Sequence, residues 1–139
     1  MTILDKSYII IVTVKILLGY GDILMRFNVV FYDLPDGTIP VQEFLGTLDA
    51  KMRAKLVMEI RMLAENGIEL REPYSKALGD GLFELRAKVG TDISRVIYFF
   101  LVGRKIVMTN GFIKKMQKTP LAEIEKARQY RAEYISRKE

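Results

Sequence analysis

The most regular pattern in the chain is the alternation of apolar and polar residues over positions 82–89. The odd-numbered positions from 83 onward are apolar, whereas the even-numbered ones carry Glu84, Arg86 and Lys88. Successive side chains of a strand point to opposite faces, so these three polar side chains are expected to share one face. The segment is therefore predicted to be a strand with one buried side.

Two further apolar segments follow this strand. Residues 93–102 are nearly continuously apolar apart from Ser94 and Arg95, and Gly103 marks a tight turn into residues 105–112. Together with the alternating strand, they predict an antiparallel meander of three strands.

Helical periodicity precedes the meander. Pro40 stands where a helix can begin, and apolar residues recur at helical spacing over residues 41–48. Asp49 is placed to cap a second helix with apolar residues from Met52 to Leu63, ended by Asn66-Gly67. Lys55 and Glu59 are assigned to the solvated face of that helix.

The last segment predicts a third helix, and with it a fold class. Thr119 is expected to cap this helix with its hydroxyl and Pro120 to open its first turn, while apolar residues from Leu121 to Ile135 dock on the sheet. A strand over residues 26–32 is free to join a sheet edge. We predict an α+β fold, a twisted antiparallel sheet of about four strands with two N-terminal helices and one C-terminal helix. The helices are expected to cover one face of the sheet and leave the other open.

Residues 1–24 differ from the rest of the chain. Their apolar run from Tyr8 to Leu18 contains Lys15 and is shorter than the about 20 residues of a membrane-spanning helix. Three interpretations stay open: an extension upstream of a domain that starts at Met25, an added edge strand, or a signal or anchor segment. We therefore divide the chain into an extension, 1–24, and one folded domain, 25–139.

The composition limits the chemistry. The 139 residues include no His, no Cys and no Trp. A zinc site built from Cys or His, a disulfide and a His-containing catalytic triad are all excluded. Acid–base chemistry would fall to carboxylates, Lys, Tyr or Arg.

The net charge of +5 is concentrated in one part of the sequence. Residues 73–118 contain 9 basic and 3 acidic side chains. Such a surplus favours a polyanionic partner such as nucleic acid, and a solvated basic surface without a partner is the alternative.

Several of these cations are expected on the open face of the sheet. Arg95 interrupts an apolar strand, a position that suits a side chain facing solvent or an anion. Converging Arg and Lys side chains would hold a phosphodiester and stabilise the charge that develops on it. The alternative for each residue is the solvated side of a strand, above all for Lys88.

Three ordered segments carry a resemblance to a known family. Lys76–Arg86, KALGDGLFELR, is similar to the signature K-x-L-x-D/G-G-L-W/F/Y-E-L-R of bacterial toxins. Arg95–Phe99 and Asn110–Pro120, the latter NGFIKKMQKTP, match further family segments in order and spacing, and Glu123–Ala127 follows them. Residues 25–135 thus resemble the HigB-like, phage-derived branch of the RelE/ParE toxin superfamily.

This resemblance implies a function. It indicates a cytoplasmic type II toxin that cleaves mRNA in the ribosomal A site without a cofactor or a metal. The ribose 2′-OH would attack the adjacent phosphate. A cognate antitoxin, usually a helix-turn-helix protein, would hold the toxin inactive, and no membrane association is expected. The implied fold, a twisted antiparallel sheet flanked by helices, agrees with the fold predicted above.

The resemblance and the basic residues together nominate a site. The predicted catalytic residues are Lys76, Glu84, Arg86, Arg95 and Tyr98. The predicted RNA-binding residues are Lys88, Asn110, Lys114, Lys115 and Lys118. At Asn110 the chain departs from the His found in many HigB-like toxins, and an amide cannot accept a proton at pH 7.

The roles within this site stay open at two points. Lys76 or Glu84 would accept the proton of the 2′-OH, although a free lysine has a pKa of about 10.4 and Glu84 could instead pair with Arg86 or Lys88. Arg86 and Arg95 would hold the phosphate, and Tyr98 would donate to the leaving oxygen or stack on a base. On a regular strand, Arg95 and Tyr98 face opposite sides, so a bulge or a twist is needed if both are to act.

A second function class stays open. The same fold could serve a protein that does not cleave RNA, either a ParE-like poison of DNA gyrase or a toxin-derived binding module. The set of Lys76, Arg86, Arg95 and Lys114 favours the nuclease, and the missing His favours the alternative.

Overall fold

The computed structural model describes residues 26–114 and 118–138. Its elements, in chain order, are β1 (Asn28–Phe31), α2 (Pro40–Thr47), α3 (Ala50–Asn66), the 3-10 turn η1 (Gly67–Glu69), β2 (Ser75–Gly79), β3 (Leu82–Val89), β4 (Asp92–Leu101), β5 (Lys105–Lys114) and α4 (Leu121–Lys138). The predicted extension 1–24 lies outside the described residues.

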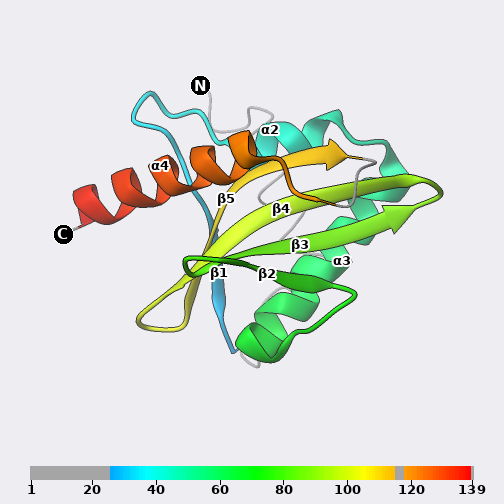
Figure 1. Cartoon of the computed structure of the whole chain (residues 1–139), viewed down its shortest axis with the longest axis horizontal. Coiled ribbons are helices and arrows are strands. Elements are labelled where there is room, and N and C mark those ends of the chain that lie inside the picture. Colours follow the sequence, from blue (N-terminus) through cyan, green and yellow to red (C-terminus); the bar gives the residue numbers. More distant parts are fainter. Residues whose placement is uncertain (1–25, 115–117, 139) are drawn as a thin grey trace, which may run out of the picture.

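The strands form one mixed sheet in the order β1-β5-β4-β3-β2 (Figure 1). The α+β class and the meander of β3, β4 and β5 are confirmed. The prediction of an entirely antiparallel sheet of about four strands is corrected, because β1 runs parallel to β5 and β2 adds a fifth strand beside β3. The direction of β1 depends on pairing with a strand distant in sequence, which a local pattern does not specify.

The ends of α3 follow the sequence closely. The Asp49 carboxylate accepts a hydrogen bond of 2.8 Å from the backbone N–H of Met52, which satisfies a free donor of the first turn. Gly67 ends the helix at φ 57°, and a Cβ there would lie 2.1 Å from the Phe27 ring. Both the predicted cap and the predicted stop are confirmed, and Gly67 also leaves the space that Phe27 occupies.

The helices cover both faces of the sheet, which corrects the prediction of a single covered face. Helices α2 and α3 pack on strand residues such as Leu85, Val96 and Ile106. Helix α4 packs on the opposite face through Ala127 and Tyr134 (Figure 1). Strands buried on both sides carry apolar residues at both parities, and this explains the unbroken apolar run of β4.

Helix α4 covers only part of its face. It packs against Ile97, Phe99 and Val107, near one end of the sheet. Leu121, which was expected to dock, is 77% exposed, whereas Ala127 is fully buried. The remainder of that face carries the polar side chains described next.

Candidate active site

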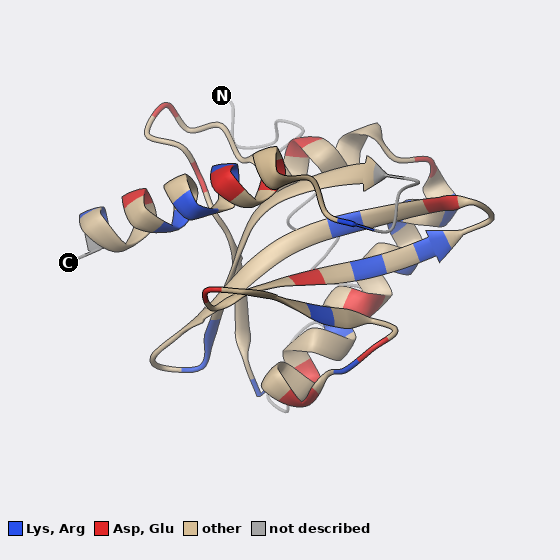
Figure 2. Cartoon of the chain, in the orientation of Figure 1, with Lys and Arg blue, Asp and Glu red and all other residues tan. Residues whose placement is uncertain are grey.

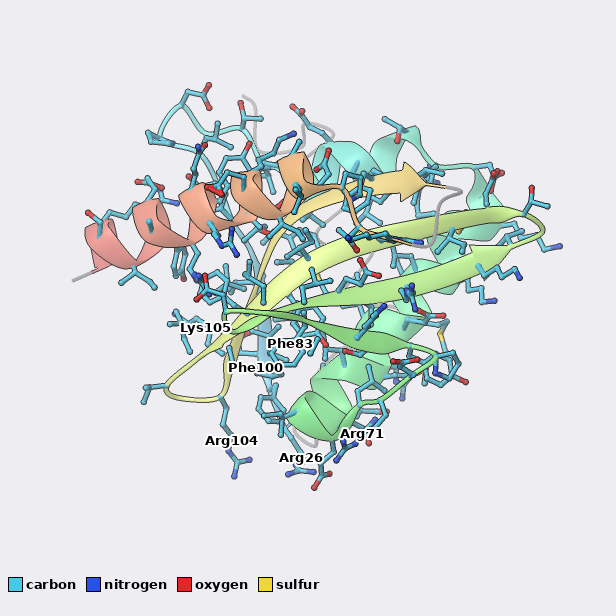
Figure 3. All side chains as sticks on the ribbon, in the orientation of Figure 1. Arg26, Arg71, Phe83, Phe100, Arg104 and Lys105 are labelled. Carbon is cyan, nitrogen blue, oxygen red and sulfur yellow. The ribbon has the colours of Figure 1, made fainter. Side chains whose placement is uncertain are left out.

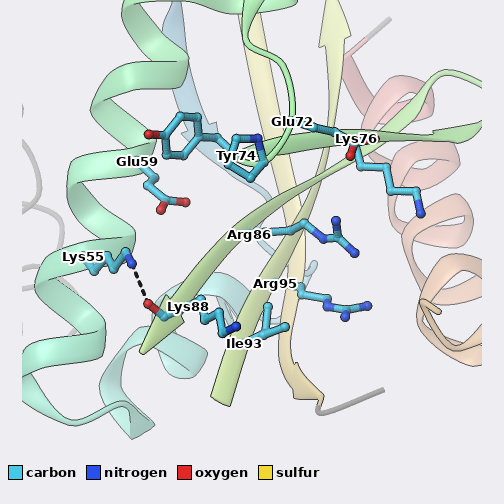
Figure 4. Close-up of a pocket in the computed structure, with 10 residues that line it drawn as sticks. Lys55, Glu59, Glu72, Tyr74, Lys76, Arg86, Lys88, Ile93 and Arg95 are labelled. Carbon is cyan, nitrogen blue, oxygen red and sulfur yellow. Dashed lines mark hydrogen bonds between the residues drawn. The ribbon is translucent and has the colours of Figure 1, made fainter. Parts of the chain in front are cut away.

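A pocket of about 550 Å³ opens beside the second half of β3 (Figure 4). Strand β2 pairs with β3 only as far as Leu85, and beyond it the backbone N–H of Arg86 donates to the carbonyl of Tyr74 at 2.8 Å. The end of β2 therefore leaves room between β3, β4 and α3. The lining residues are Lys55, Glu59, Glu72, Pro73, Tyr74, Lys76, Arg86, Lys88, Ile93 and Arg95.

Strand register brings four predicted site residues to one face. Lys76 lies opposite Glu84, and Arg86 lies opposite Arg95. Directly opposed residues of antiparallel strands share a face, and positions 84 and 86 share it by alternation. Figure 2 shows the basic segments of β2, β3 and β4 side by side with the acidic segment of β3. The predicted grouping of Glu84 with Arg86 on one strand face is confirmed.

Glu84 is the buried counter-charge of this group. Its side chain is 0% exposed, and its Oε2 lies 2.8 Å from Nε of Arg86 and 3.8 Å from a terminal nitrogen of Arg95. The Thr119 hydroxyl donates to its other oxygen, Oε1. A carboxylate enclosed in this way is out of reach of a ribose hydroxyl. These contacts favour the ion-pair alternative for Glu84 over a role as the base.

The two arginines differ in access. The Arg86 side chain is 21% exposed, whereas that of Arg95 is 0% exposed. Burial lowers the pKa of Arg95, Glu84 opposes this change, and Arg86 adds to it. Because an arginine stays protonated in proteins, Arg95 contributes a fixed buried charge and Arg86 a guanidinium that a ligand can reach.

Thr119 has a role that the sequence did not predict. The helix begins at Leu121, and the Thr119 hydroxyl donates a hydrogen bond to Glu84 instead of capping the first turn. The residue lies within the Asn110–Pro120 segment that carries the family resemblance. Its hydrogen bond attaches the chain just before α4 to the centre of the arginine group.

Tyr98 lies on the opposite face from Arg95 and is not among the residues that line the pocket, and its catalytic role stays a prediction. The irregularity in the β4–β5 register leaves Thr109 of β5 unpaired, so the alternation of β4 itself is unbroken. The Tyr98 hydroxyl hydrogen-bonds to Ser75, and its ring stacks on Phe83 at 5.6 Å. Burial raises the pKa of Tyr98 to about 12, although the hydrogen bond with Ser75 acts to lower it. The raised pKa makes it harder for Tyr98 to donate a proton.

Asn110 lies under α4 and is not among the residues that line the pocket, and its assignment to RNA binding stays a prediction. It is 3% exposed, and its side-chain N–H groups donate to the backbone carbonyl and the carboxylate of Glu123 at 3.2 and 3.0 Å. The residue fixes the first turn of α4 to β5.

The predicted RNA-binding lysines are spread out. Lys88 lines the pocket and is exposed, whereas Lys118 is exposed but is not among the lining residues. Lys114 ends β5, its side chain is not described, and Lys115 lies outside the described residues.

The basic surplus of residues 73–118 does not gather at one place. Arg104 and Lys105 lie at the β4–β5 hairpin, at the other end of β4 from Arg95 (Figure 3). Only part of the surplus, therefore, surrounds the pocket.

Two lining residues of α3 were not predicted as site residues. Glu59 is 4% exposed, although it was assigned to a solvated face, and its Oε1 has no hydrogen-bond partner among the described residues. Burial raises the pKa of Glu59 to about 7, and the charge of Lys55 opposes the rise. Helical spacing could have shown that Glu59 lies on the buried face of α3, because position 59 follows Leu56 by three residues and precedes Leu63 by four.

Comparison with known proteins identifies one family. The family model described as "Phage derived protein Gp49-like (DUF891)" matches residues 43–132. A search of curated proteins finds no significant match. In the described parts of the chain, no cluster of three or more acidic, His or Cys side chains could hold a metal ion. None of the helices within residues 26–114 and 118–138 has the length and apolar character needed to cross a bilayer.

Proposed function

The chain belongs to the Gp49-like family of phage-derived proteins, and we propose that it is the toxin of a type II toxin–antitoxin system. Its proposed activity is ribosome-dependent cleavage of mRNA, as in HigB-like members of the RelE/ParE superfamily. The observation that carries the proposal is the pocket in which Lys76, Arg86 and Arg95 share one sheet face around the buried carboxylate of Glu84. Such a site suits a phosphodiester anion.

The proposed reaction needs only RNA, protein side chains and water. The 2′-oxygen bonds to the adjacent phosphorus, the bond from phosphorus to the 5′-oxygen breaks, and the products are a 2′,3′-cyclic phosphate and a 5′-OH. Arg86 holds a non-bridging oxygen, and Arg95 supplies positive potential from below. Lys76 is the remaining candidate to accept the 2′-OH proton, since Glu84 is enclosed and Tyr98 faces away. The leaving oxygen takes a proton from water.

Two macromolecular partners belong to the proposal. The ribosome would present the message, and a cognate antitoxin of the helix-turn-helix type would keep the enzyme inactive in its host. The partly exposed side chain of Arg86 and the exposed Lys76 and Lys88 support a macromolecular substrate, because they leave part of the site open to solvent.

The first prediction tests the activity directly. Purified protein is added to a translating system with a defined message, and cleaved ends are mapped for a 2′,3′-cyclic phosphate and a 5′-OH. We expect Arg86→Ala to reduce cleavage about 100-fold, since it removes a donor to the developing charge. Arg26→Ala is the matched control, because Arg26 also pairs with a glutamate but lies on the exposed surface at 3.5 Å from Glu69.

Melting curves of both variants check that they fold. Intact message in the presence of wild-type protein, together with relaxed or linear DNA accumulating beside gyrase, would replace the nuclease by the ParE-like alternative. Equal cleavage by wild type and Arg86→Ala would remove Arg86 from the site.

A further inference from the structure

The pocket has two walls of different chemistry. Figure 4 shows Lys76, Arg86 and Arg95 extending away from α3, whereas Glu59 projects from α3 beside the ring of Tyr74. The first wall suits phosphate. The second wall combines a carboxyl group and an aromatic ring, and the proposed phosphate chemistry uses neither.

Glu59 is an acceptor without a donor. Its side chain is almost fully buried, and the described residues supply no hydrogen bond to Oε1. Lys55, one turn earlier on α3, directs its ammonium group to the backbone carbonyl of Lys88 at 2.5 Å. A buried carboxylate with an unpaired acceptor is costly while it is ionised, and a ligand that supplies the missing donors would remove that cost.

Tyr74 provides a stacking surface next to this acceptor. Its side chain is 38% exposed, and it follows Pro73 in the segment that leads into β2. The Tyr74 carbonyl accepts the backbone N–H of Arg86 at 2.8 Å, so one hydrogen bond links the two walls. Aromatic rings that stack unpaired bases are a common means of recognising single-stranded RNA.

We propose that Glu59 and Tyr74 form a nucleobase subsite that selects guanine next to the phosphate held by Arg86. The guanine Watson–Crick edge offers two adjacent donors, N1–H and the N2 amino group, which match the two oxygens of a carboxylate. Adenine and cytosine offer one donor beside an acceptor, and uracil offers one donor between two acceptors. The inference rests on the proposed function, because it assumes that RNA occupies the pocket.

The test uses RNA alone, without ribosomes. Four tetranucleotides that differ in one base, with 2′-O-methyl groups to prevent cleavage, are titrated into the full chain at pH 8, where the Glu59 carboxyl group, with its pKa of about 7, is mostly ionised. We expect the guanine ligand to bind about tenfold more tightly than the adenine ligand, as one bidentate base contact allows. Replacing guanine by hypoxanthine, which lacks the N2 amino group, should remove most of this difference.

Glu59→Gln gives the sharper result. A carboxamide presents one donor and one acceptor, which match N1 and the N6 amino group of adenine, so the preference should move from guanine to adenine. Glu65→Gln is the control, because Glu65 lies on the same helix, pairs with Arg61 at 3.3 Å and does not line the pocket. Tyr74→Ala should weaken binding of all four ligands to a similar extent.

The outcomes separate this inference from the function on which it rests. Equal affinity for all four bases, or an unchanged preference in Glu59→Gln, overturns the subsite. Ribosome-dependent cleavage by a protein without base preference leaves the proposed function standing and removes only the subsite. A guanine preference in a protein that never cleaves mRNA supports the subsite and contradicts the nuclease.

Discussion

The two faces of the sheet are made from alternate residues of the same strands, yet they differ in cover and chemistry. On the α2–α3 face, Phe83, Tyr98 and Phe100 pack together at ring distances of 5.4 to 5.7 Å. On the α4 face, one strand position away, Glu84 and Arg95 bury charges. The comparison shows that the α2–α3 face carries the larger apolar cluster, whereas the α4 face combines a smaller apolar cluster with buried charged groups.

The two faces also hold their helices differently. Helix α3 contributes a row of buried apolar residues to the core, including Leu56, Ile60 and Leu63. Helix α4 buries less and is attached by side-chain ion pairs, among them Arg131 with Asp80 at 2.7 Å. Because exposed ion pairs stabilise a fold only weakly, α4 depends on its short apolar contact and on the polar contacts of Thr119 and Asn110.

The largest expected effect compares neighbours on β3. Glu84→Ala leaves the buried Arg95 without its counter-charge, and we expect it to lower the free energy of unfolding by about 3–5 kcal/mol. Leu85→Ala, on the opposite face, should cost about 2–5 kcal/mol through an ordinary cavity. Urea denaturation measures both changes.

Glu84→Gln separates charge from shape in this comparison. The amide oxygen can still accept from Thr119, but the charge is lost, so a substantial destabilisation should persist. Wild-type stability in Glu84→Gln would show that the arginines do not need the carboxylate, and the two faces would then be energetically alike.

An intermediate effect concerns Glu59 and pH. Its pKa is raised from 4.5 to about 7, so the folded state binds the proton more tightly than the unfolded state. Its favourable contribution is full below about pH 4.5 and is lost as the pH rises through 7. The same pocket is lined by Lys55, Tyr74 and Lys88. Among the described contacts, none of these residues donates a hydrogen bond to Glu59.

Glu59→Gln should therefore be more stable than wild type at pH 8, by about 3 kcal/mol, and similar to it at pH 4. Denaturation at a series of pH values checks this, with Glu65→Gln as the control. Parallel curves for wild type and Glu59→Gln would contradict a buried, unpartnered carboxyl group.

The smallest expected effect distinguishes the faces by activity. Tyr98→Phe removes the hydrogen bond with Ser75 and should cost about 1 kcal/mol of stability. Cleavage should be unchanged, since the ring lies on the α2–α3 face. Loss of cleavage with an intact melting curve would place Tyr98 in the site after all.

Much of the fold was predictable because it depends on local patterns. The alternation on β3, the Asp49 cap and the Gly67 stop each arise within a few residues, and each is confirmed. Glu59 could have been identified from helical spacing, but its charge favoured the solvated face. Strand β2 was not predicted, because its short and mostly exposed sequence lacks a regular pattern.

The site was only partly predictable. The sequence pattern grouped Glu84 with Arg86, but the roles of Thr119 and Asn110 depend on where α4 crosses the sheet. The sequence already showed that Arg95 and Tyr98, three positions apart, face opposite sides of a regular strand. That β4 is regular was decided only by the register of β5, in which the extra residue is Thr109 rather than a residue of β4.

By itself, the sequence determined the absence of His and Cys, the alternating strand and the helix ends, because these depend on composition and neighbouring residues. The tertiary structure alone decided that β1 runs parallel to β5, that α4 covers part of the polar face, and that Glu84 is enclosed while Arg86 stays accessible. These features arise from contacts between residues far apart in the chain, and burial, which sets the free energy of a charge, exists only once those contacts form.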